Sequence, residues 1–391
     1  MIKTNYTCGI DIGTHTTKVV VMGFDKEKKE HIILATGMSQ TNGVRFGYIT
    51  NVDQVTLSIN KAVKQAENIC GIKIRKAFVS IGGVSLSSIV STGSVIISKA
   101  DQEITNLDVL KVLANSEENL DIVNKKIIHV IPIGYKLDGK DIYARPEGLR
   151  GIKLEVKTLF ITCLKQNIED LTTAFALAKI DIEEIIASPL ATGSILVNNK
   201  QKIAGCVLVD IGAETVSTVV FENNLPISVS VFPIGSMDIT KDIALGLKIS
   251  LEEAESIKLG SVTGGDYSKR KVDEIIEARL GDIFELIGNQ LKRLKRNELL
   301  PAGIIITGNG SSINNICEIA RGQLKLPAKI GVLDSPTHNK FKLRDVSWYT
   351  ALGLALTTSS EFSNDQTNNS IGVNVKEIKS FFKSILSQLL P

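Results

Sequence analysis

Two turns that follow strand-ending aspartates carry the residue types with the clearest chemical use in this chain. The first turn combines an acid, a glycine, two threonines and a lysine: Asp11, Gly13, Thr14, Thr16 and Lys18. Such a turn between two short apolar strands points backbone N–H groups and hydroxyls outward, which makes a nest for an anion. Asp11 could orient a water molecule on a bound Mg²⁺. Taken alone, the pattern predicts either a phosphate site or a plain tight hairpin.

The second turn repeats the first about half a chain later. Residues 210–220 align with residues 11–21 without a gap, and the second segment has the acid, the glycine and a threonine at equivalent places: Asp210, Gly212 and Thr215. Again an apolar strand leads into the turn and a β-rich strand leads out. Two such hairpins indicate a duplicated domain whose halves face each other across one nucleotide.

The elements that must position the first turn are typical of an α/β layer. We expect a strand at 31–38, a glycine-punctuated loop at 41–51, a helix at 52–71 and a buried strand at 76–81. Between about residue 84 and residue 163 the pattern changes to three strands and one helix of their own.

We interpret this middle stretch as an inserted α+β subdomain. Its strands are expected at 88–98, 126–137 and 153–163, and its helix at 107–120. The alternative is a continuous first domain with long loops, but long structureless loops are uncommon in compact domains.

Three further features follow the middle stretch, the first of them before the second half begins. A helix opens at Ser188-Pro189 after a strand at 182–187, and a long amphipathic helix is expected at 272–294. The basic end of that helix is either a solvated face or a partner-binding patch. A buried strand from residue 303 then runs into the glycine turn at 308–311, whose lack of side chains lets the backbone lie flat against a ligand.

Composition excludes several classes of protein. With 391 residues, 43% hydrophobic and 22% charged, the chain is long enough for two or more packed domains, and its net charge of +3 is too small to indicate nucleic acid. No apolar run of about 18 residues predicts a membrane span, and no signal peptide is expected. Five scattered cysteines and four histidines indicate reduced thiols in a cytosol and no structural metal site.

The C-terminal segment has a separate pattern. Residues 359–374 are poor in apolar side chains and predict a flexible tether. Residues 375–391 then place apolar side chains on one helical face and lysines on the other, which suits a helix lying in a membrane interface. A helix that docks on the body or on a partner is the alternative. The membrane-facing candidates are Phe381, Phe382, Ile385, Leu386 and Leu389, flanked by Lys379 and Lys383.

These motifs resemble, in their order, those of the actin-like ATPase superfamily, in which two related domains close on ATP. The motifs are Asp11-x-Gly13…Lys18, Asp210-x-Gly212-x-x-Thr215 and Gly308-x-Gly310-Ser311. Within the superfamily, the insert, the loop from Gly43 to Ile49 and the tethered C-terminal helix look like the bacterial cell-division family FtsA.

The resemblance implies an actin-like α/β fold with two duplicated domains around a nucleotide cleft. The expected parts are 1–83 and 164–198 (first domain), 84–163 (insert), 199–338 (second domain), 339–358 (return helix), 359–374 (linker) and 375–391 (membrane helix).

It also implies roles for individual residues. The first phosphate site would comprise Asp11, Gly13, Thr14, Thr16 and Lys18, with Lys18 as a point charge, and the second would comprise Asp210, Gly212 and Thr215. Asp11 and Asp210 would lie near Mg²⁺ and act through water. The adenosine contacts would be Glu255, Lys258, Gly308, Asn309, Gly310 and Ser311.

One departure from the superfamily pattern bears on turnover. Related chaperone ATPases have a Glu before the proline of the first link, and actins have a Gln there, whereas this chain has Ser188 before Pro189. Serine cannot act as a general base at neutral pH. We therefore expect ATP binding with at most weak hydrolysis, and we assign no catalytic residue.

The function that the resemblance implies is that of a polymerising membrane adaptor of cell division. It would bind ATP and Mg²⁺, lie as a peripheral protein on the cytoplasmic face of the cell membrane at the division site, and tether filaments of FtsZ. Its partners would be the FtsZ C-terminal tail, copies of itself, anionic lipid and other division proteins, but no nucleic acid. The alternative is an actin-like ATP-binding scaffold of type IV pilus assembly, which generally lacks such a tail.

Overall fold

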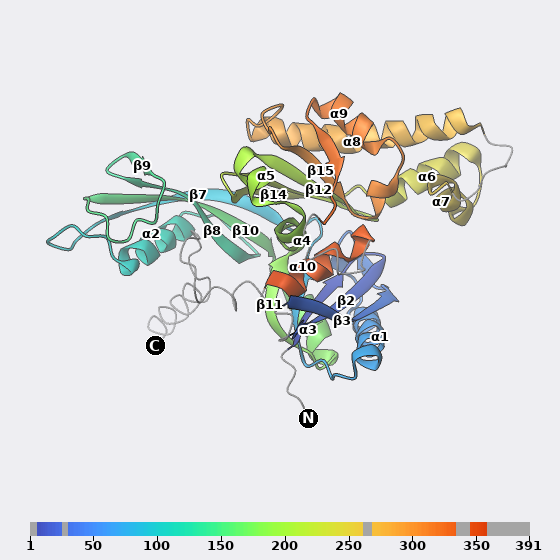
Figure 1. Ribbon diagram of the computed structural model, residues 1–391, viewed down its shortest axis with the longest axis horizontal. Coiled ribbons are helices and arrows are strands. Elements are labelled where there is room, and N and C mark those ends of the chain that lie inside the picture. The colour runs from blue at the N-terminus through green and yellow to red at the C-terminus, as the bar shows by residue number, and fades with distance from the viewer. Residues whose placement is uncertain (1–5, 26–29, 261–267, 334–344, 358–391) are drawn as a thin grey trace. The chain divides into compact units, whose positions relative to one another are not determined.

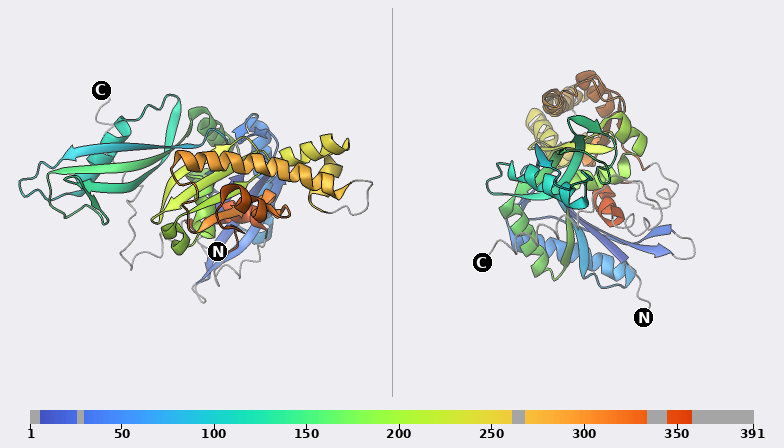
Figure 2. Two further views of the ribbon diagram at one scale, coloured as in Figure 1. Left: turned by 90° about the horizontal axis from the view of Figure 1, so that it is seen from above. Right: turned by 90° about the vertical axis from the view of Figure 1, so that its left-hand side faces the viewer.

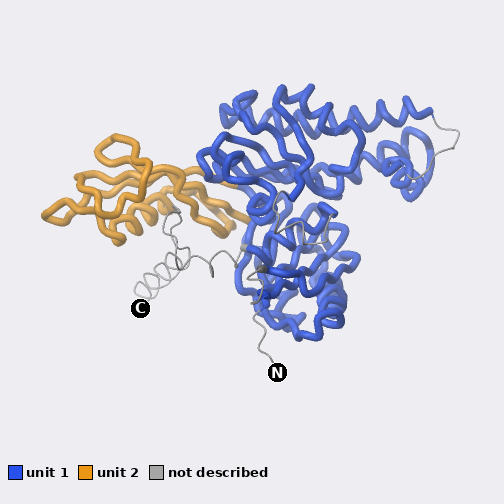
Figure 3. The backbone as a smooth tube through the Cα atoms, in the orientation of Figure 1, with its two compact units in different colours: residues 1–87, 164–362 blue, residues 88–163, 363–391 orange. Residues whose placement is uncertain are grey.

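The computed structural model describes residues 6–25, 30–260, 268–333 and 345–357 and forms two compact units, coloured separately in Figure 3. Among the described residues, the larger unit comprises those within 1–87 and 164–357, and the smaller comprises 88–163. The inserted subdomain is thereby confirmed. The helix that we expect at 375–391 lies outside the described residues, and the exact domain boundaries stay predictions.

The first sheet of the larger unit has five strands. Figure 1 labels β2, β3 and β11 of this sheet. Their order is β11 (Asp181–Ala187), β6 (Lys76–Ile81), β1 (Tyr6–Ile12), β2 (Thr16–Asp25) and β3 (Glu30–Gln40). β1 is antiparallel to β2 and parallel to β6. Strand β2 forms because its central run, Val19 to Met22, is fully buried and suits a covered sheet.

Helices cover both faces of this sheet, and two glycines allow their close approach. A Cβ at Gly37 would overlap the backbone of Ala62 in α1 (Val52–Cys70). A Cβ at Gly9 would overlap Ala351 in α10 (Tyr349–Thr357). Gly37 pairs with Val19 and Gly9 pairs with Val20, so the two helices lie on opposite faces. Helix α3 (Lys165–Leu177) packs beside α1.

The second sheet of the larger unit repeats the arrangement of the first. Its strand order is β16 (Ala328–Ile330), β15 (Gly303–Thr307), β12 (Cys206–Ile211), β13 (Val216–Glu222) and β14 (Leu225–Phe232). β12 is antiparallel to β13 and parallel to β15, as β1 is to β2 and β6. This repeat confirms the predicted duplication.

One hydrophobic core joins the second sheet to its long helices. Buried side chains of β12 and β15 pack with those of α8 (Lys269–Arg293) and α9 (Ile316–Leu324), which lie together in Figures 1 and 2. Helices α6 (Ser236–Leu247) and α7 (Leu251–Lys258) pack on each other, and Ser250 caps α7 by accepting the Glu253 N–H.

Two helices of small residues join the two halves of the larger unit. Helix α4 (Ser188–Leu196) packs against α10, because Gly353 allows the backbone of Ala191 to come close. The hydroxyls of Thr192 and Thr350 form a buried hydrogen bond of 3.0 Å across this contact. The small residues of α10 therefore have a packing reason.

The smaller unit is a sheet with one helix. Its strand order is β7 (Ser87–Ile96), β10 (Lys153–Leu164), β8 (Lys125–Leu137) and β9 (Lys140–Ile142), and α2 (Asn106–Glu118) begins at a capping box on Thr105. Strand β9, the short helix α5 (Asn199–Ala204) and the small hairpin β4 (Val44–Arg45) to β5 (Tyr48–Ile49) were not expected from the sequence. Within the described ranges, no helix has the length and apolarity needed to cross a membrane.

Candidate functional site

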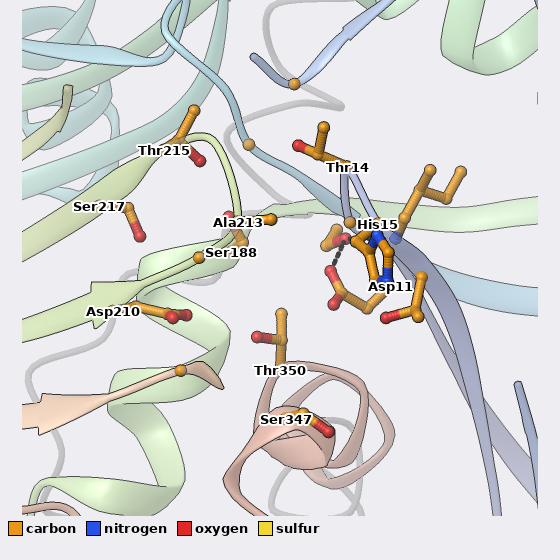
Figure 4. A pocket seen from close by; sticks show the side chains of 18 of the residues that line it. Asp11, Thr14, His15, Ser188, Asp210, Ala213, Thr215, Ser217, Ser347 and Thr350 are labelled. Atoms are coloured by element: carbon orange, nitrogen blue, oxygen red, sulfur yellow. Dashed lines mark hydrogen bonds between the residues drawn. The ribbon is translucent and has the colours of Figure 1, made fainter. Parts of the chain in front are cut away.

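A cavity of about 150 Å³ lies where the two repeated hairpins meet (Figure 4). The first hairpin is β1–β2 and the second hairpin is β12–β13. All eight residues predicted for the two phosphate sites line this cavity: Asp11, Gly13, Thr14, Thr16, Lys18, Asp210, Gly212 and Thr215. The fold thus brings together two segments that are about half a chain apart.

The two turns have the same backbone geometry. In the first hairpin the Gly13 N–H donates to the Thr16 carbonyl at 3.1 Å, and in the second the Gly212 N–H donates to the Thr215 carbonyl at 2.9 Å. The strand-ending aspartates occupy equivalent register positions, opposite Lys18 for Asp11 and opposite Ser217 for Asp210. This match in backbone and register supports a common binding role for the turns.

The carboxylate of Asp11 is held by a neighbouring strand. Ser80 of β6 donates its hydroxyl to Asp11 Oδ1 at 2.6 Å, the dashed bond in Figure 4. Burial raises the pKa of Asp11, and the Ser80 hydrogen bond and the charge of Lys18 oppose that rise. The hydrogen bond also fixes where the carboxylate points.

The environment of Asp210 disfavours the ionised carboxylate and, among the described residues, lacks a hydrogen bond like the one that Ser80 donates to Asp11. Burial, and after it the negative charge of Asp11, raises the pKa of Asp210 to about 6, while Lys18 lowers it. Asp210 also packs against the backbone at Gly308, where a Cβ would overlap Asp210 Oδ1. Because Gly308 has φ +82°, only glycine fits there easily. Gly308 thus makes room for the acid in addition to any contact with a ligand.

Lys18 is a buried cation in this cavity. Burial lowers the pKa of Lys18, and the nearby charges of Asp11, Asp345 and Asp210 raise it. Its Nζ lies 6.0 Å from the centre of the Trp348 ring, which offers a weak cation–π contact. Of the three carboxylates near this ammonium, Asp11 and Asp210 line the cavity, and together they exceed its one positive charge, so a further cation would suit the cavity.

The two partly buried aspartates fit a magnesium ion that is held mainly by other ligands. Among the residues that the structure describes, no three His, Cys, Asp or Glu side chains converge on one point. Mg²⁺ usually keeps several waters and takes one or two carboxylates together with substrate phosphates. Asp11 and Asp210 supply such a pair. Burial raises the pKa of both acids, and a dication near them would stabilise the ionised carboxylates and oppose that rise.

The residues predicted to contact adenosine are only partly brought together. Gly308 and Asn309 line the cavity, but the other four do not: Glu255, Lys258, Gly310 and Ser311. Lys258 is buried and bonded within the fold, with its Nζ 2.7 Å from Glu255 Oε2 and 2.8 Å from Thr240 Oγ1. The adenosine assignment therefore stays a prediction.

Ser188 lies at the wall of the cavity and is engaged by the backbone. Its hydroxyl donates to the Ile81 carbonyl at 3.3 Å, and a Cβ at Gly82 would come within 2.8 Å of Ser188 Oγ. The residue at this place is therefore small, confined and without basic character.

Several lining residues were missed from the sequence. They are His15, Gly47, Ser80, Gly82, Gly83, Ala213, Ser217, Val346, Ser347 and Thr350. His15, Ala213 and Ser217 belong to the two predicted hairpins, and the Ser-x-Gly-Gly sequence at the end of β6 is a local signal for Ser80, Gly82 and Gly83. Gly47, Val346, Ser347 and Thr350 reach the cavity through long-range packing, which a local pattern does not report.

Two family models and several curated proteins match this chain over most of its length. The family model described as "Cell division protein FtsA" matches residues 207–353, and "SHS2 domain inserted in FTSA" matches residues 83–162. The "Cell division protein FtsA" of Bacillus subtilis (strain 168) is 30% identical over 366 residues, which cover 88% of this chain and 81% of that protein. The protein of the same name from Pseudomonas aeruginosa is 26% identical, with 89% and 88% covered.

Solved structures show the same fold at lower identity. A chain of the "PilM-PilN type IV pilus biogenesis complex" has a TM-score of 0.66 and 17% identity, and covers 90% of this chain and 98% of that one. MreB5 of Spiroplasma citri bound to ADP has a TM-score of 0.52 and 12% identity, with 92% and 99% covered. These likenesses establish the actin-like fold and nothing finer.

Proposed function

The chain belongs to the FtsA family of cell division proteins, and from this premise we propose that it is an ATP-binding, polymerising adaptor that tethers FtsZ filaments to the membrane. The family assignment favours this function over the pilus-assembly scaffold, because the likeness to the PilM chain is one of fold at 17% identity.

The observation that carries the nucleotide part of the proposal is the pair of matched turns on one cavity. Backbone N–H groups and hydroxyls of both turns are available to phosphate oxygens, and Lys18 adds a positive charge. A fold relative, MreB5, is bound to ADP. Asp11 and Asp210 would hold Mg²⁺ through water. The ion would reduce the electrostatic repulsion between the phosphates and the carboxylates of Asp11 and Asp210.

Hydrolysis would be slow in this proposal. Ser188 stands where chaperone ATPases carry Glu and actins carry Gln. Its hydroxyl donates to a backbone carbonyl, and serine cannot accept a proton from water at neutral pH. Positioning and a bound cation can still support slow phosphoryl transfer. A steady-state phosphate-release assay should therefore give turnover well below one per second, and brisk Mg²⁺-dependent hydrolysis would contradict the proposal.

The membrane part of the proposal depends on residues 375–391, which lie outside the described residues. Its support is the sequence pattern of an apolar face opposed by lysines. A single interfacial helix binds a bilayer modestly, but many helices on one filament bind together with large avidity. The protein would then act on the cytoplasmic face of the membrane, with copies of itself, the FtsZ C-terminal tail, anionic lipid and other division proteins as partners.

Co-sedimentation with liposomes containing anionic lipid tests this part. The full chain with Mg²⁺ and ATP should pellet with the liposomes and bring FtsZ with it, and a chain lacking residues 375–391 should not pellet while still binding ATP. Phe382→Glu, on the apolar face, should abolish pelleting, and Ser384→Glu, on the opposite face, should weaken it little. Pelleting that survives the deletion would remove the anchor.

A further inference from the structure

The loop between β4 and β5 is a second point at which the two halves of the larger unit meet. This loop turns at Phe46 and Gly47, which have φ of 50° and 78°. Positive φ suits glycine but is unfavourable for a bulky side chain such as Phe. The surroundings of Phe46 must therefore hold it in this conformation.

A carboxylate of the second hairpin holds the loop from one side. The Phe46 N–H donates to Glu214 Oε2 at 2.8 Å, and Arg45 Nε lies 2.8 Å from Glu214 Oε1. Glu214 stands in the turn between Ala213 and Thr215, two residues that line the cavity. Its side chain is 14% exposed, against 61% for Arg45, so the acid is the more fixed partner.

The first half of the unit holds the same loop from the other side. The Phe46 carbonyl accepts the Val84 N–H at 3.1 Å. Gly47 and Gly83 pack so closely that a Cβ on either would overlap the other's Cα region. Both glycines line the cavity. The loop is thus fixed at once by the strand end after β6 and by the turn of the second hairpin.

We propose that Glu214 is a latch that closes this loop over the phosphate end of the cavity and slows the release of bound nucleotide. The proposal rests on the proposed function, since it assigns regulation to the same site. The Glu214 carboxylate stands beside a turn that receives phosphate, where an uncompensated negative charge would repel the ligand. Arg45 compensates that charge only while the loop is docked.

Docking and nucleotide binding therefore favour each other. A docked loop neutralises Glu214 and covers the cavity, and bound phosphate raises the electrostatic cost of leaving Glu214 without Arg45. By linkage, each event stabilises the other by the same amount. Loss of the latch should mainly raise the dissociation rate of the nucleotide, because a docked loop slows the departure of bound nucleotide more than it slows nucleotide association.

Stopped-flow release of a fluorescent ATP analogue, chased with unlabelled ATP, tests the latch in the full chain with Mg²⁺. Glu214→Ala removes both contacts, and dissociation should be about tenfold faster. Arg45→Gln leaves the Glu214 charge uncompensated beside the phosphate and should accelerate release about threefold. Glu214→Gln also loses the ion pair, but it keeps an acceptor for the Phe46 N–H and removes the repelling charge, so it should accelerate release less than Arg45→Gln does. The Arg45→Gln/Glu214→Gln double variant should be no faster than Arg45→Gln alone, since both changes remove one interaction.

Glu274→Gln is the matched control, because Glu274 forms an ion pair with Arg270 in α8 that is 62% and 88% exposed. This variant should release the analogue at the wild-type rate. Thermal unfolding identifies any variant that fails to fold. Amide exchange adds a readout without nucleotide, in which Glu214→Ala should lose the protection of the Phe46 N–H.

The outcomes separate the two proposals. A wild-type chain that binds no nucleotide refutes the proposed function, and with it any role of the latch in retention. A wild-type chain that binds, with Glu214→Ala releasing at the same rate, overturns the latch alone. Unchanged Phe46 exchange in Glu214→Ala also overturns it.

Discussion

The first and second hairpins share a backbone and differ in charge. Each places an aspartate before the same glycine turn, and each turn closes with the same N–H to carbonyl bond. Opposite the aspartate, however, the first hairpin has Lys18 and the second has Ser217. In the turn itself the first has His15 where the second has Glu214.

This difference indicates a division of labour between two copies of one motif. The first hairpin supplies positive charge, and its acid is fixed by Ser80. The second supplies Asp210, with its raised pKa, and Glu214, which reaches across to the loop at Phe46. Duplication has kept the backbone geometry of the turn and has changed the charged residues around it.

The largest expected effect comes from removing the charge that distinguishes the first hairpin. Lys18→Met keeps the apolar length of the side chain but leaves Asp11 and Asp210 without their shared cation. Truncating one partner of a buried charge pair costs about 2–5 kcal/mol. We expect the dissociation constant for Mg-ATP to rise about 100-fold or more, as measured by isothermal titration calorimetry.

Ser217→Ala is the matched change in the second hairpin, because Ser217 has the same register position as Lys18. It should weaken the binding of Mg-ATP by less than about fivefold, since a neutral hydroxyl contributes about 1 kcal/mol or less. Equal losses in the two variants would show that the hairpins are equivalent and would break the comparison.

The next effect concerns the two aspartates in the nucleotide-free protein. Asp210→Asn removes an acid whose pKa is raised to about 6 by burial, from an ordinary value of about 3.9. The folded state therefore holds the proton more tightly, and ionisation costs stability. We expect Asp210→Asn to raise the free energy of unfolding at pH 7 by on the order of 2 kcal/mol.

The stability gained by Asp210→Asn should depend on pH. Below about pH 4 Asp210 is protonated in both states, so the variant and the wild type should be equally stable. The gain should grow between about pH 4 and pH 6 and stay constant above. Asp11→Asn should gain less, because it loses the Ser80 hydrogen bond to a charged acceptor. Urea unfolding across this pH range measures both, and a destabilised Asp210→Asn at pH 7 would contradict the account.

The smallest effect tests the shared geometry of the turns. A Cβ at Gly13 or at Gly212 would lie 3.0 Å from the carbonyl oxygen of Thr16 or Thr215. Gly13→Ala and Gly212→Ala should therefore each lower the free energy of unfolding by about 1 kcal/mol, and by the same amount within error. Gly322→Ala in α9 meets no atom and should be neutral or stabilising by up to about 1 kcal/mol. Clearly unequal turn variants would show that the turns differ.

The parts of this picture that follow from local sequence were predictable. Asp11 and Asp210 can be identified from the sequence, because a strand-ending acid, a glycine and a threonine are close together and recur without a gap. The insert was predictable because its strands and its helix change the pattern of the chain. The actin-like fold and the cell-division family are confirmed.

The remaining features depend on contacts that no local pattern reports. Ser80 reaches Asp11 across 69 residues, and Glu214 reaches Phe46 across 168. The close contact between Gly47 and Gly83 likewise joins two segments that are separate in the sequence. Lys258 shows the converse case, since its motif predicts a ligand contact while the structure gives it partners inside the fold. Sequence indicated which residues of the two hairpins line the cavity, and packing decides how their charges are balanced.

The central claim is that both hairpins hold one nucleotide. A crystal structure of the full chain with Mg²⁺ and a non-hydrolysable ATP analogue tests it most directly. The account predicts phosphate oxygens against the turns at Gly13 and Gly212 together, with one Mg²⁺ facing Asp11 and Asp210 through water. A nucleotide that contacts only one hairpin, or lies outside this cavity, would contradict it.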